Sequence, residues 1–449
     1  MLRLISILVV SGFVAGCNNS KKDSQIQELA TTSILGKQFY APYCIYLLDE
    51  KNAITVDEIK NLASKYLPEY KLVDSLSDKI GSGEYIIEWS SDPENEYPAP
   101  DLDYLSHTAH GLTDHEMNQL QSPFAAVLIA FSGTNKNVLN DQVAINQLIS
   151  SLIQKSSAIV MDYTTYESFN SKSWEEDRAS NFNETNQDIT SQFTIHLYRE
   201  NEFCRAVTLG LGKFCLPDIS IQNLSCRNEK SFGSLINLIC QTMLERPVIR
   251  VDTTMVVDIT ALMNDSVKTR LINSLGENAT KSALINLSLV EPQQGDAYNT
   301  QYEIVFTNRN YSSEQEEQEV LISRVFGSTD QIEYVNHDEK ILQASQRAKE
   351  KLPYLRSMFT DGLEPGYSIL LKGPFETDKG GREWMWIEVT AWTDDSIKGI
   401  LQNDPYEISG LSAGSIVSIN QNDVFDYILY LPDGSTEGNE TGKIIGGEE

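Results

Sequence analysis

Apolar positions recur along the chain with two spacings, which predict alternating strands and helices. The run from Tyr43 to Leu48 is continuously apolar and typical of a buried strand. Thr55-Val56-Asp57-Glu58 has the spacing of a capping box, and we expect the helix that it begins to end at Pro68. A strand over 124–131 precedes an amphipathic helix whose apolar face runs from Val143 to Ile153. These segments predict an α/β sandwich with helices on one face of a mixed sheet.

The same alternation returns after a polar, aromatic stretch from Tyr163 to Asp188, which we interpret as a long loop between two units. It continues with a strand at 193–197, a helix with an apolar face from Phe232 to Met243, and a closing hairpin over 282–290 and 302–306. We therefore predict two α/β modules of ferredoxin-like type within an α+β or α/β chain. A divergent duplication would explain the shared pattern, although no residue-level repeat is visible. The two modules are expected over 39–165 and 190–326.

A third unit with a different pattern is predicted over 336–432. It begins with a charged helix that we expect to end at Pro353, and short strands follow. One helix followed by short antiparallel strands predicts a small curled sheet with the helix packed across it. We expect the last residues, 433–449, to form a disordered acidic tail. The predicted strands are 367–372, 384–392, 397–401 and 415–419.

Several short motifs in this third unit occur in the order of a known family. They are Leu352-Pro353, Lys372, Glu383-Trp384-Met385-Trp386, Gly399, Asn403-Asp404-Pro405, Leu411-Ser412-Ala413-Gly414 and Asp426-Tyr427. The combination resembles the YegJ-type domain of unknown function. The sequence departs from the family at Ser415, where Asp commonly follows the Gly, and at Tyr427, where Trp is usual. The resemblance covers about a fifth of the chain and implies a fold but no established activity.

The first seventeen residues have the organisation of an export signal. Arg3 is followed by an apolar run from Leu4 to Val14, about 11 residues long and too short to cross a bilayer as a helix. Val14-Ala15-Gly16-Cys17 resembles the lipobox of bacterial lipoproteins, which implies that Cys17 is lipidated and begins the mature chain. An ordinary secretory signal is the alternative. Residues 1–17 are thus the predicted signal and 18–38 a flexible linker.

The residue after the lipobox cysteine bears on localisation. By resemblance to lipoprotein sorting in Gram-negative bacteria, Asn18 in place of Asp favours the outer membrane, with the body facing the periplasm. We therefore expect a cell-envelope protein anchored to the membrane through lipid.

Charge narrows the range of partners. The chain has 35 Lys and Arg against 64 Asp and Glu, and its formal net charge is −29. Nucleic acids and anionic lipid surfaces are therefore poor partners. A solvated acidic surface explains the charge more simply than a dedicated site for a cation, and no calcium-binding loop motif occurs.

The cysteines fit an oxidising compartment. If Cys17 is lipidated, five remain, and four of these lie close together between Cys204 and Cys240. We expect one or two disulfides in that region, with Cys44 a buried thiol. The pairing is left open among Cys44, Cys204, Cys215, Cys226 and Cys240.

Two motifs suggest catalysis, and we favour a structural interpretation of each. Gly410-Leu411-Ser412-Ala413-Gly414 matches the nucleophile elbow of hydrolases, but every histidine precedes Ser412 and a strand, not a helix, is predicted to follow it. His107, His110 and His115 are the only histidine cluster, and they lack the spacing of a metal-binding motif. We predict no catalytic residue, cofactor or metal site.

Three tryptophans of the third unit are the candidate binding residues. Trp384, Trp386 and Trp392 fall at even positions of one predicted strand, so a regular strand would place them on one face. They would then either pack under the helix of the unit or line a groove for a ligand or peptide. Met385, Ile387 and Val389 would face the core.

These observations favour a non-enzymatic envelope lipoprotein that binds a protein or a small ligand. One alternative is an enzyme of the envelope, either a hydrolase using carboxylates or a metal-dependent enzyme using His107, His110 and His115. Another is a membrane-tethered immunity or stress protein that captures a basic partner through its acidic surface.

Overall fold

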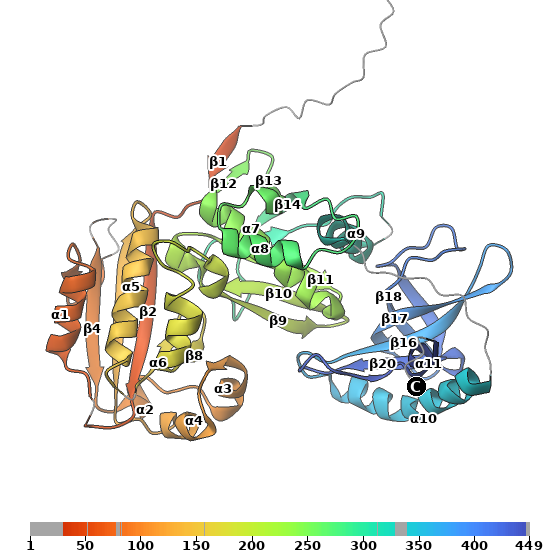
Figure 1. Cartoon of the computed structure of the whole chain (residues 1–449), viewed down its shortest axis with the longest axis horizontal. Coiled ribbons are helices and arrows are strands. Elements are labelled where there is room, and N and C mark those ends of the chain that lie inside the picture. Colours follow the sequence, from red (N-terminus) through yellow and green to blue (C-terminus); the bar gives the residue numbers. More distant parts are fainter. Residues whose placement is uncertain are drawn as a thin grey trace, which may run out of the picture.

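The computed structural model describes residues 30–51, 53–77, 81, 83–156, 158–311, 313–327 and 339–445. It contains a seven-stranded sheet, two six-stranded sheets and a two-stranded ladder, which confirms the α+β class (Figure 1). We call the parts built on the three large sheets the first module, the second module and the C-terminal domain. Within the described residues, no helix is both long enough and apolar enough to span a bilayer.

The first module has a ferredoxin-like core, as predicted. Four central strands lie in the order β4-β6-β2-β7, and each is antiparallel to its neighbours. Along the chain, α1 follows β2 and α5 follows β6. Thr55 forms the predicted capping box with Glu58 at the start of α1. The full sheet is β3 (Lys71–Leu72), β4 (Glu84–Ser90), β6 (Ala125–Thr134), β2 (Gln38–Leu47), β7 (Ala158–Asp162), β8 (Glu167–Phe169) and β5 (Ala109–His110), with α1 (Val56–Tyr66) and α5 (Val138–Ile153).

Helices cover both faces of this sheet, whereas we predicted them on one. Leu105 and Leu120 pack against Cys44 and Tyr46 of β2 on the face opposite α1 and α5. The extra layer is the segment between β4 and β6, where the sequence has weak periodicity. Its helices are α2 (Pro93–Glu96), α3 (Leu102–Thr108) and α4 (Asp114–Leu120).

The stretch predicted as a loop from Tyr163 to Asp188 is structured. It contributes strand β8, helix α6 (Ser171–Ser173) and a π-helical segment, η1 (Trp174–Ala179). Trp174 is fully buried against Tyr43 and Phe169. The prediction was wrong because one buried Trp and one buried Arg178 hold the segment, and neither gives a periodic signal.

The second module has a strand order other than the ferredoxin-like one. Two three-stranded meanders lie side by side, joined where β11 and β15 pair in parallel. The predicted closing hairpin is the antiparallel pair β14 and β15. The sheet is β13 (Thr254–Asp258), β14 (Ser282–Val290), β15 (Gln301–Ile304), β11 (Asp218–Leu224), β10 (Phe203–Leu209) and β9 (Thr194–Glu200).

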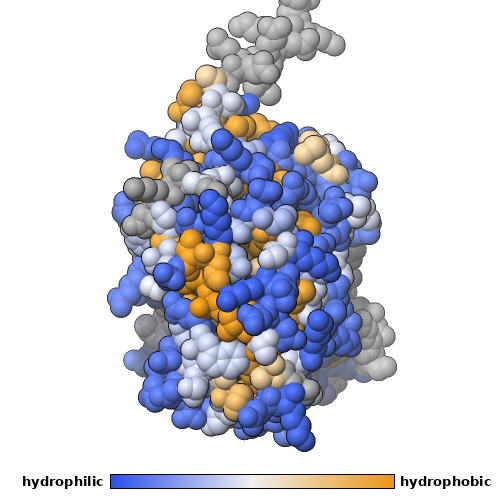
Figure 2. All heavy atoms as spheres, turned by 90° about the vertical axis from the view of Figure 1, so that its left-hand side faces the viewer, coloured by the Kyte–Doolittle hydropathy of each residue, from blue (hydrophilic) through white to orange (hydrophobic). Residues whose placement is uncertain are grey.

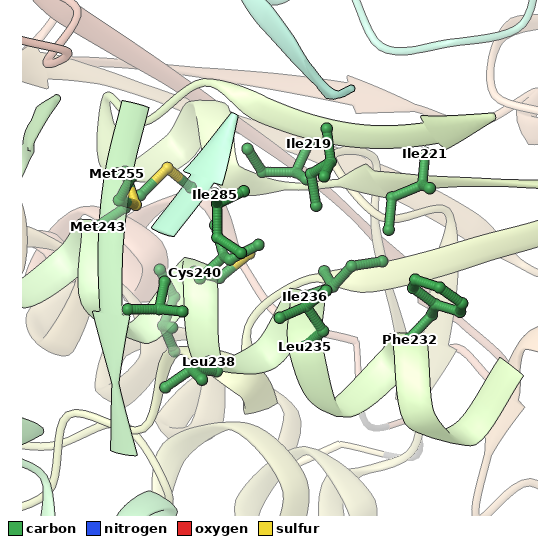
Figure 3. Packing of buried hydrophobic residues seen from close by; sticks show 14 of the residues in the cluster. Ile219, Ile221, Phe232, Leu235, Ile236, Leu238, Cys240, Met243, Met255 and Ile285 are labelled. Atoms are coloured by element: carbon green, nitrogen blue, oxygen red, sulfur yellow. The ribbon is translucent and has the colours of Figure 1, made fainter. Parts of the chain in front are cut away.

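Helix α7 (Glu229–Glu245) supplies the centre of this module's core. Phe232, Leu235 and Ile236 are almost completely buried and belong to one cluster with residues of β11, β13 and β14 (Figure 3). Ile239 belongs to the same cluster. The apolar face predicted from Phe232 to Met243 is therefore confirmed. The remaining helical segments are η2 (Ile189–Ser191), η3 (Leu211–Phe214), η4 (Cys226–Asn228), η5 (Ile259–Ala261), α8 (Asp265–Asn273) and α9 (Glu314–Phe326).

The described start of the chain is tied to the second module. β1 (Thr31–Ser33) pairs with β12 (Val248–Arg250), although 18–38 was predicted to be a flexible linker. The backbone N–H of Gly36 also donates to the carbonyl of Cys215 at 2.8 Å. The three residues of β1 are polar and exposed, so no apolar pattern marked this strand.

The C-terminal domain is a curled antiparallel sheet with a helix packed across it, as predicted. Helix α10 (Glu339–Asp361) continues through Pro353 because Leu352 and Leu355, on either side of the proline, are buried against the sheet. A proline inside a helix removes one backbone hydrogen bond, and this packing offsets the loss. The sheet is β19 (Ile416–Asn420), β18 (Ser396–Leu401), β17 (Arg382–Trp392), β16 (Ser368–Glu376), β20 (Asp426–Tyr430) and β21 (Thr436–Gly438), with η6 (Gln421–Asp423).

The tail predicted to be disordered from 433 is ordered as far as it is described. It forms β21 and α11 (Glu440–Ile445), which packs on α10. The buried carboxylate of Asp426 accepts hydrogen bonds from the backbone N–H and the hydroxyl of Thr441. Polar caps of this kind do not appear as apolar periodicity, so the tail was misjudged.

The exposed surface is mainly hydrophilic on the side drawn in Figure 2. Figure 2 shows hydrophilic residues over most of one side of the molecule, with hydrophobic residues gathered in patches between them. Ligand sites in proteins are usually concave, so a cavity is a better candidate site than this hydrated outer surface.

Candidate functional site

The residues singled out from sequence are not brought together in one site. Cys17 lies outside the described residues. Of the three histidines, His110 contacts Glu167 through Nε2 at 3.0 Å and stacks on Phe169. No group of three or more metal-ligating side chains occurs in the described parts of the chain.

Ser412 lies at a junction between the C-terminal domain and the second module. Its hydroxyl donates to Oε1 of Glu316 on α9 at 2.6 Å. The Ser313 hydroxyl, which caps α9, donates to the carbonyl of Gly414 at 3.0 Å. The glycine-flanked turn therefore serves as a contact surface.

The three tryptophans of β17 do not share a face. The pairing of β17 with β18 is irregular between Val389 and Ala391, and this shift turns Trp392 toward the core. Trp392 is 9% exposed and belongs to the same cluster as Met385, Ile387 and Val389. Trp384 and Trp386 stay on the opposite face and are half-buried.

The face of β17 that carries Trp384 and Trp386 also carries a buried acid. Glu388 accepts a hydrogen bond from the Ser225 hydroxyl and another from the backbone N–H of Arg227 at 3.1 Å. Burial raises the pKa of Glu388, while Ser225 and the guanidinium of Arg199 lower it. These bonds join the C-terminal domain to the second module. Lys398 of β18 adds an ion pair to Glu202 at 2.6 Å.

A cleft of about 460 Å³ lies beside this junction. Its floor is the end of β9, from Leu197 to Arg199, together with Cys204 and Cys226. One wall is the start of α7, and the other is made by two loops of the C-terminal domain, 363–368 and 430–434. The volume is in the range of sites for small ligands and short peptide segments. We take this junction cleft as the candidate functional site.

A disulfide fixes the floor of the junction cleft. Cys204 on β10 and Cys226 on η4 are bonded, with a sequence separation of 22. One or two disulfides were predicted within the 204–240 region, and one is present; the other cysteines there, Cys215 and Cys240, are free and buried, as is the predicted buried thiol Cys44. The bond holds the start of α7 against the sheet, so it sets the shape of the cleft.

The cleft is lined by both cations and aromatic rings. Arg227 places its guanidinium over the ring of Tyr430 at 5.1 Å, and its Nη1 donates to Oε1 of Gln402 at 3.2 Å. Arg199 is partly buried, and desolvation lowers its pKa. Lys230 on the first turn of α7 is exposed at the rim. The arrangement can hold an anionic group below a surface suited to flat or apolar groups.

A second cluster of charges lies between the first and second modules and is closed to solvent. Nζ of Lys213 contacts Asp162 at 2.6 Å, and Arg178 bonds to Glu167. Asp162, Lys213 and Arg178 are at most 2% exposed. Burial lowers the pKa of Lys213 to about 8. With no room for a ligand, the cluster works as a clamp between modules.

Sequence reasoning missed the cleft because its residues come from distant segments. Tyr430 lies more than two hundred positions after both Arg199 and Arg227, and none of the three belongs to a recognisable motif. The only sequence signal for this region was a pair of cysteines near the basic residues, which indicated a disulfide there.

The motifs of the third unit mainly shape turns. Oδ1 of Asn403 accepts from the backbone N–H of Trp386 at 3.2 Å, and Oδ1 of Asp404 accepts from that of Ala413 at 2.9 Å. A Cβ on Gly399 would meet the carbonyl oxygen of Glu388 at 2.2 Å, so only glycine fits there. These residues therefore specify the fold.

Comparison with known proteins identifies one region. Residues 338–446 match a family described as "Uncharacterized protein conserved in bacteria (DUF2314)". This range contains α10, the third sheet and α11, and thus one wall of the junction cleft. Searches of curated proteins and of solved structures found no match to the chain.

Proposed function

We propose that the chain is an exported lipoprotein, anchored to the membrane by acylation of Cys17, whose body binds a ligand in the junction cleft. The observation that carries the binding function is the cleft itself, in which unrelated segments bring Arg199, Arg227 and Tyr430 together around a disulfide floor. A disulfide is typical of proteins that fold outside the cytoplasm, which supports export.

The same proposal extends to family and location. We infer that the C-terminal domain is of the YegJ type, because the motifs from Leu352 to Tyr427 occur in that order and form its turns. Asn18 after the lipobox cysteine supports an outer-membrane address with the body in the periplasm. We infer a binding rather than a catalytic function, since the hydroxyl of the motif serine, Ser412, is engaged by Glu316.

Membrane fractionation of Cys17→Ser tests the anchor. Without the thiol no acyl group can be attached, so we expect the variant in the soluble fraction and the unaltered chain in the membrane fraction until detergent is added. Asn18→Asp is the matched control, since it keeps the anchor and should move the protein from the outer to the inner membrane. Detergent-dependent retention of Cys17→Ser would contradict the proposed anchor.

Thermal unfolding of the full mature chain carrying Cys17→Ser tests the cleft. A ligand that binds only the folded state raises the melting temperature, and the shift grows with the logarithm of the ligand concentration above its Kd. We expect a shift with carboxylate or phosphate probes that disappears in Arg227→Gln and persists in Arg309→Gln, which removes an exposed charge of the same module. Shifts that are equal in the two variants would place the binding elsewhere.

A further inference from the structure

The three cations of the junction cleft form no close ion pair in the described structure, although Arg199 and Arg227 both interact electrostatically with the buried carboxylate of Glu388. Among the described residues, Arg199, Arg227 and Lys230 form no ion pair within 4.0 Å, although the chain has 64 acidic residues and only 35 basic ones. The only hydrogen bond of the Arg199 guanidinium in the described structure goes to the carbonyl of Glu202 at 3.5 Å. Partly desolvated guanidinium groups gain most from an anion that can accept two hydrogen bonds.

The acidic residues near the cleft do not replace such an anion. The buried carboxylate of Glu388 is not part of the cleft lining, and its hydrogen bonds come from Ser225 and the backbone of Arg227. The guanidinium groups of Arg199 and Arg227 interact with its charge from beyond ion-pair distance. Asp433 is at the exposed rim and accepts bonds from the backbone and hydroxyl of Ser435. Glu364 is also exposed at the rim. The rim thus carries charges of both signs, with Lys230 beside Glu364 and Asp433, whereas the two arginines lie deeper and are partly buried. This arrangement favours a single, localised anionic group.

The floor of the cleft is also the free edge of a sheet. β9 is the last strand in the order of the second sheet and pairs only with β10. Within the described structure, no backbone group of residues 194–200 bonds to any other element. Alternate residues of an edge strand direct their N–H and C=O groups outward, where an extended chain can pair with them. Leu197, Tyr198 and Arg199 bring this edge into the cleft.

We propose that the junction cleft binds an extended peptide, which adds to the edge of β9 and places one carboxylate against Arg199 and Arg227. This inference rests on the proposed function and names the ligand class for the same site. Backbone pairing to β9 supplies affinity without regard to sequence, and the two guanidinium groups supply the preference for an acidic residue or a chain terminus. Tyr198 and Tyr430 provide aromatic surface for the neighbouring side chain.

An array of synthetic octapeptides tests the inference on the full mature chain with Cys17→Ser. Each peptide is made in three forms: with one Glu, with Gln in its place, and with Glu and N-methyl groups on alternate backbone nitrogens. We expect a set of Glu forms to bind at least tenfold more tightly than their Gln forms. N-methylation should abolish binding, because it removes the donors that pair with a sheet edge.

Binding to variants of the cleft tests whether the peptide carboxylate lies against Arg199 and Arg227. Arg199→Gln and Arg227→Gln should each reduce binding of the Glu forms at least tenfold and remove the preference over Gln. Lys230→Gln alters an exposed residue that the fold does not need and should reduce binding severalfold. Arg309→Gln should leave binding unchanged. Equal binding of Glu and Gln forms, or a preference that survives both arginine variants, would overturn the inference.

Binding measurements with inorganic phosphate and citrate distinguish failure of the peptide inference from failure of the proposed binding function. If either anion binds in an Arg227-dependent manner while no peptide does, the cleft is a ligand site but the peptide assignment is wrong. If neither the peptides nor the anions bind, the inference and the binding function both fail.

Discussion

Trp392 illustrates how one irregular residue changes the role of a side chain. Strict alternation would place it beside Trp384 and Trp386, but the bulge between Val389 and Ala391 turns it to the other face. There its indole N–H donates to Oε1 of Gln421 at 2.8 Å, and the ring packs near Phe359. Of the three candidate binding residues, Trp392 is therefore a core residue.

Replacing Trp392 should cost far more than replacing Trp386. We expect Trp392→Ala to lower the free energy of unfolding by about 3–5 kcal/mol, because it leaves a cavity and an unpaired glutamine. Trp386→Ala, the matched change on the half-buried face, should cost about 1 kcal/mol. Urea denaturation followed by fluorescence measures both values, and equal losses would show that the bulge does not separate the two faces.

At the scale of elements, predictions based on apolar period were the most reliable. The spacing of Phe232, Leu235, Ile236 and Ile239 predicted α7, and the alternation in 384–392 predicted β17. Elements held by polar contacts were missed, such as β1 and α11. Pro353 misled the prediction of α10 because burial of the surrounding residues outweighs the lost hydrogen bond.

Helix α11 depends on the buried carboxylate of Asp426, and this dependence can be measured. Thr441→Val keeps the shape of the side chain and removes the hydroxyl that bonds to Asp426. The carboxylate keeps the bond from the Thr441 backbone N–H but loses one hydrogen bond to a charged acceptor, which is worth about 1.5–3 kcal/mol, so we expect a loss of this size in the unfolding free energy. Thr436→Val, at an exposed position of β21, is the control and should be nearly neutral. A neutral result for Thr441→Val would mean that α11 does not need this cap.

At the scale of the whole molecule, buried charges join the parts. Lys213 of the second module is paired with Asp162 of the first, and Glu388 of the C-terminal domain bonds to Ser225 of the second module. No sequence pattern could reveal these pairs, since their members lie about 50 to 160 positions apart. The junction cleft escaped prediction for the same reason, because it exists only where two parts meet.

The buried charge cluster that contains Glu167 should make the free energy of unfolding depend on pH in the acid range. Burial alone would raise the pKa of Glu167, but Arg178 and His110 outweigh it and lower the pKa to about 2. The unfolded value is near 4.5, so this carboxylate stabilises the fold above about pH 4.5 and loses its contribution as the pH falls toward 2.

Glu167→Gln should therefore flatten the acid limb of the stability curve. The shift corresponds to about 3 kcal/mol, so the unfolding free energy of the variant should fall less steeply between pH 4.5 and 2. Urea denaturation at a series of pH values measures the two slopes. Glu94→Gln, which changes an exposed carboxylate, should keep the slope of the original protein. Parallel curves for the original protein and Glu167→Gln would exclude the clamp as the source of acid sensitivity.

The pairing of β1 with β12 has a mechanical consequence for a chain tethered at Cys17. Traction from a membrane would enter the body at Thr31 and be borne first by three residue pairs of the ladder, and then by the bond from Gly36 to Cys215. In Figure 1 this point of attachment lies at the top of the molecule, away from α10 at the bottom. The force would thus break the short polar ladder between β1 and β12 before it acted on the sheet of the first module.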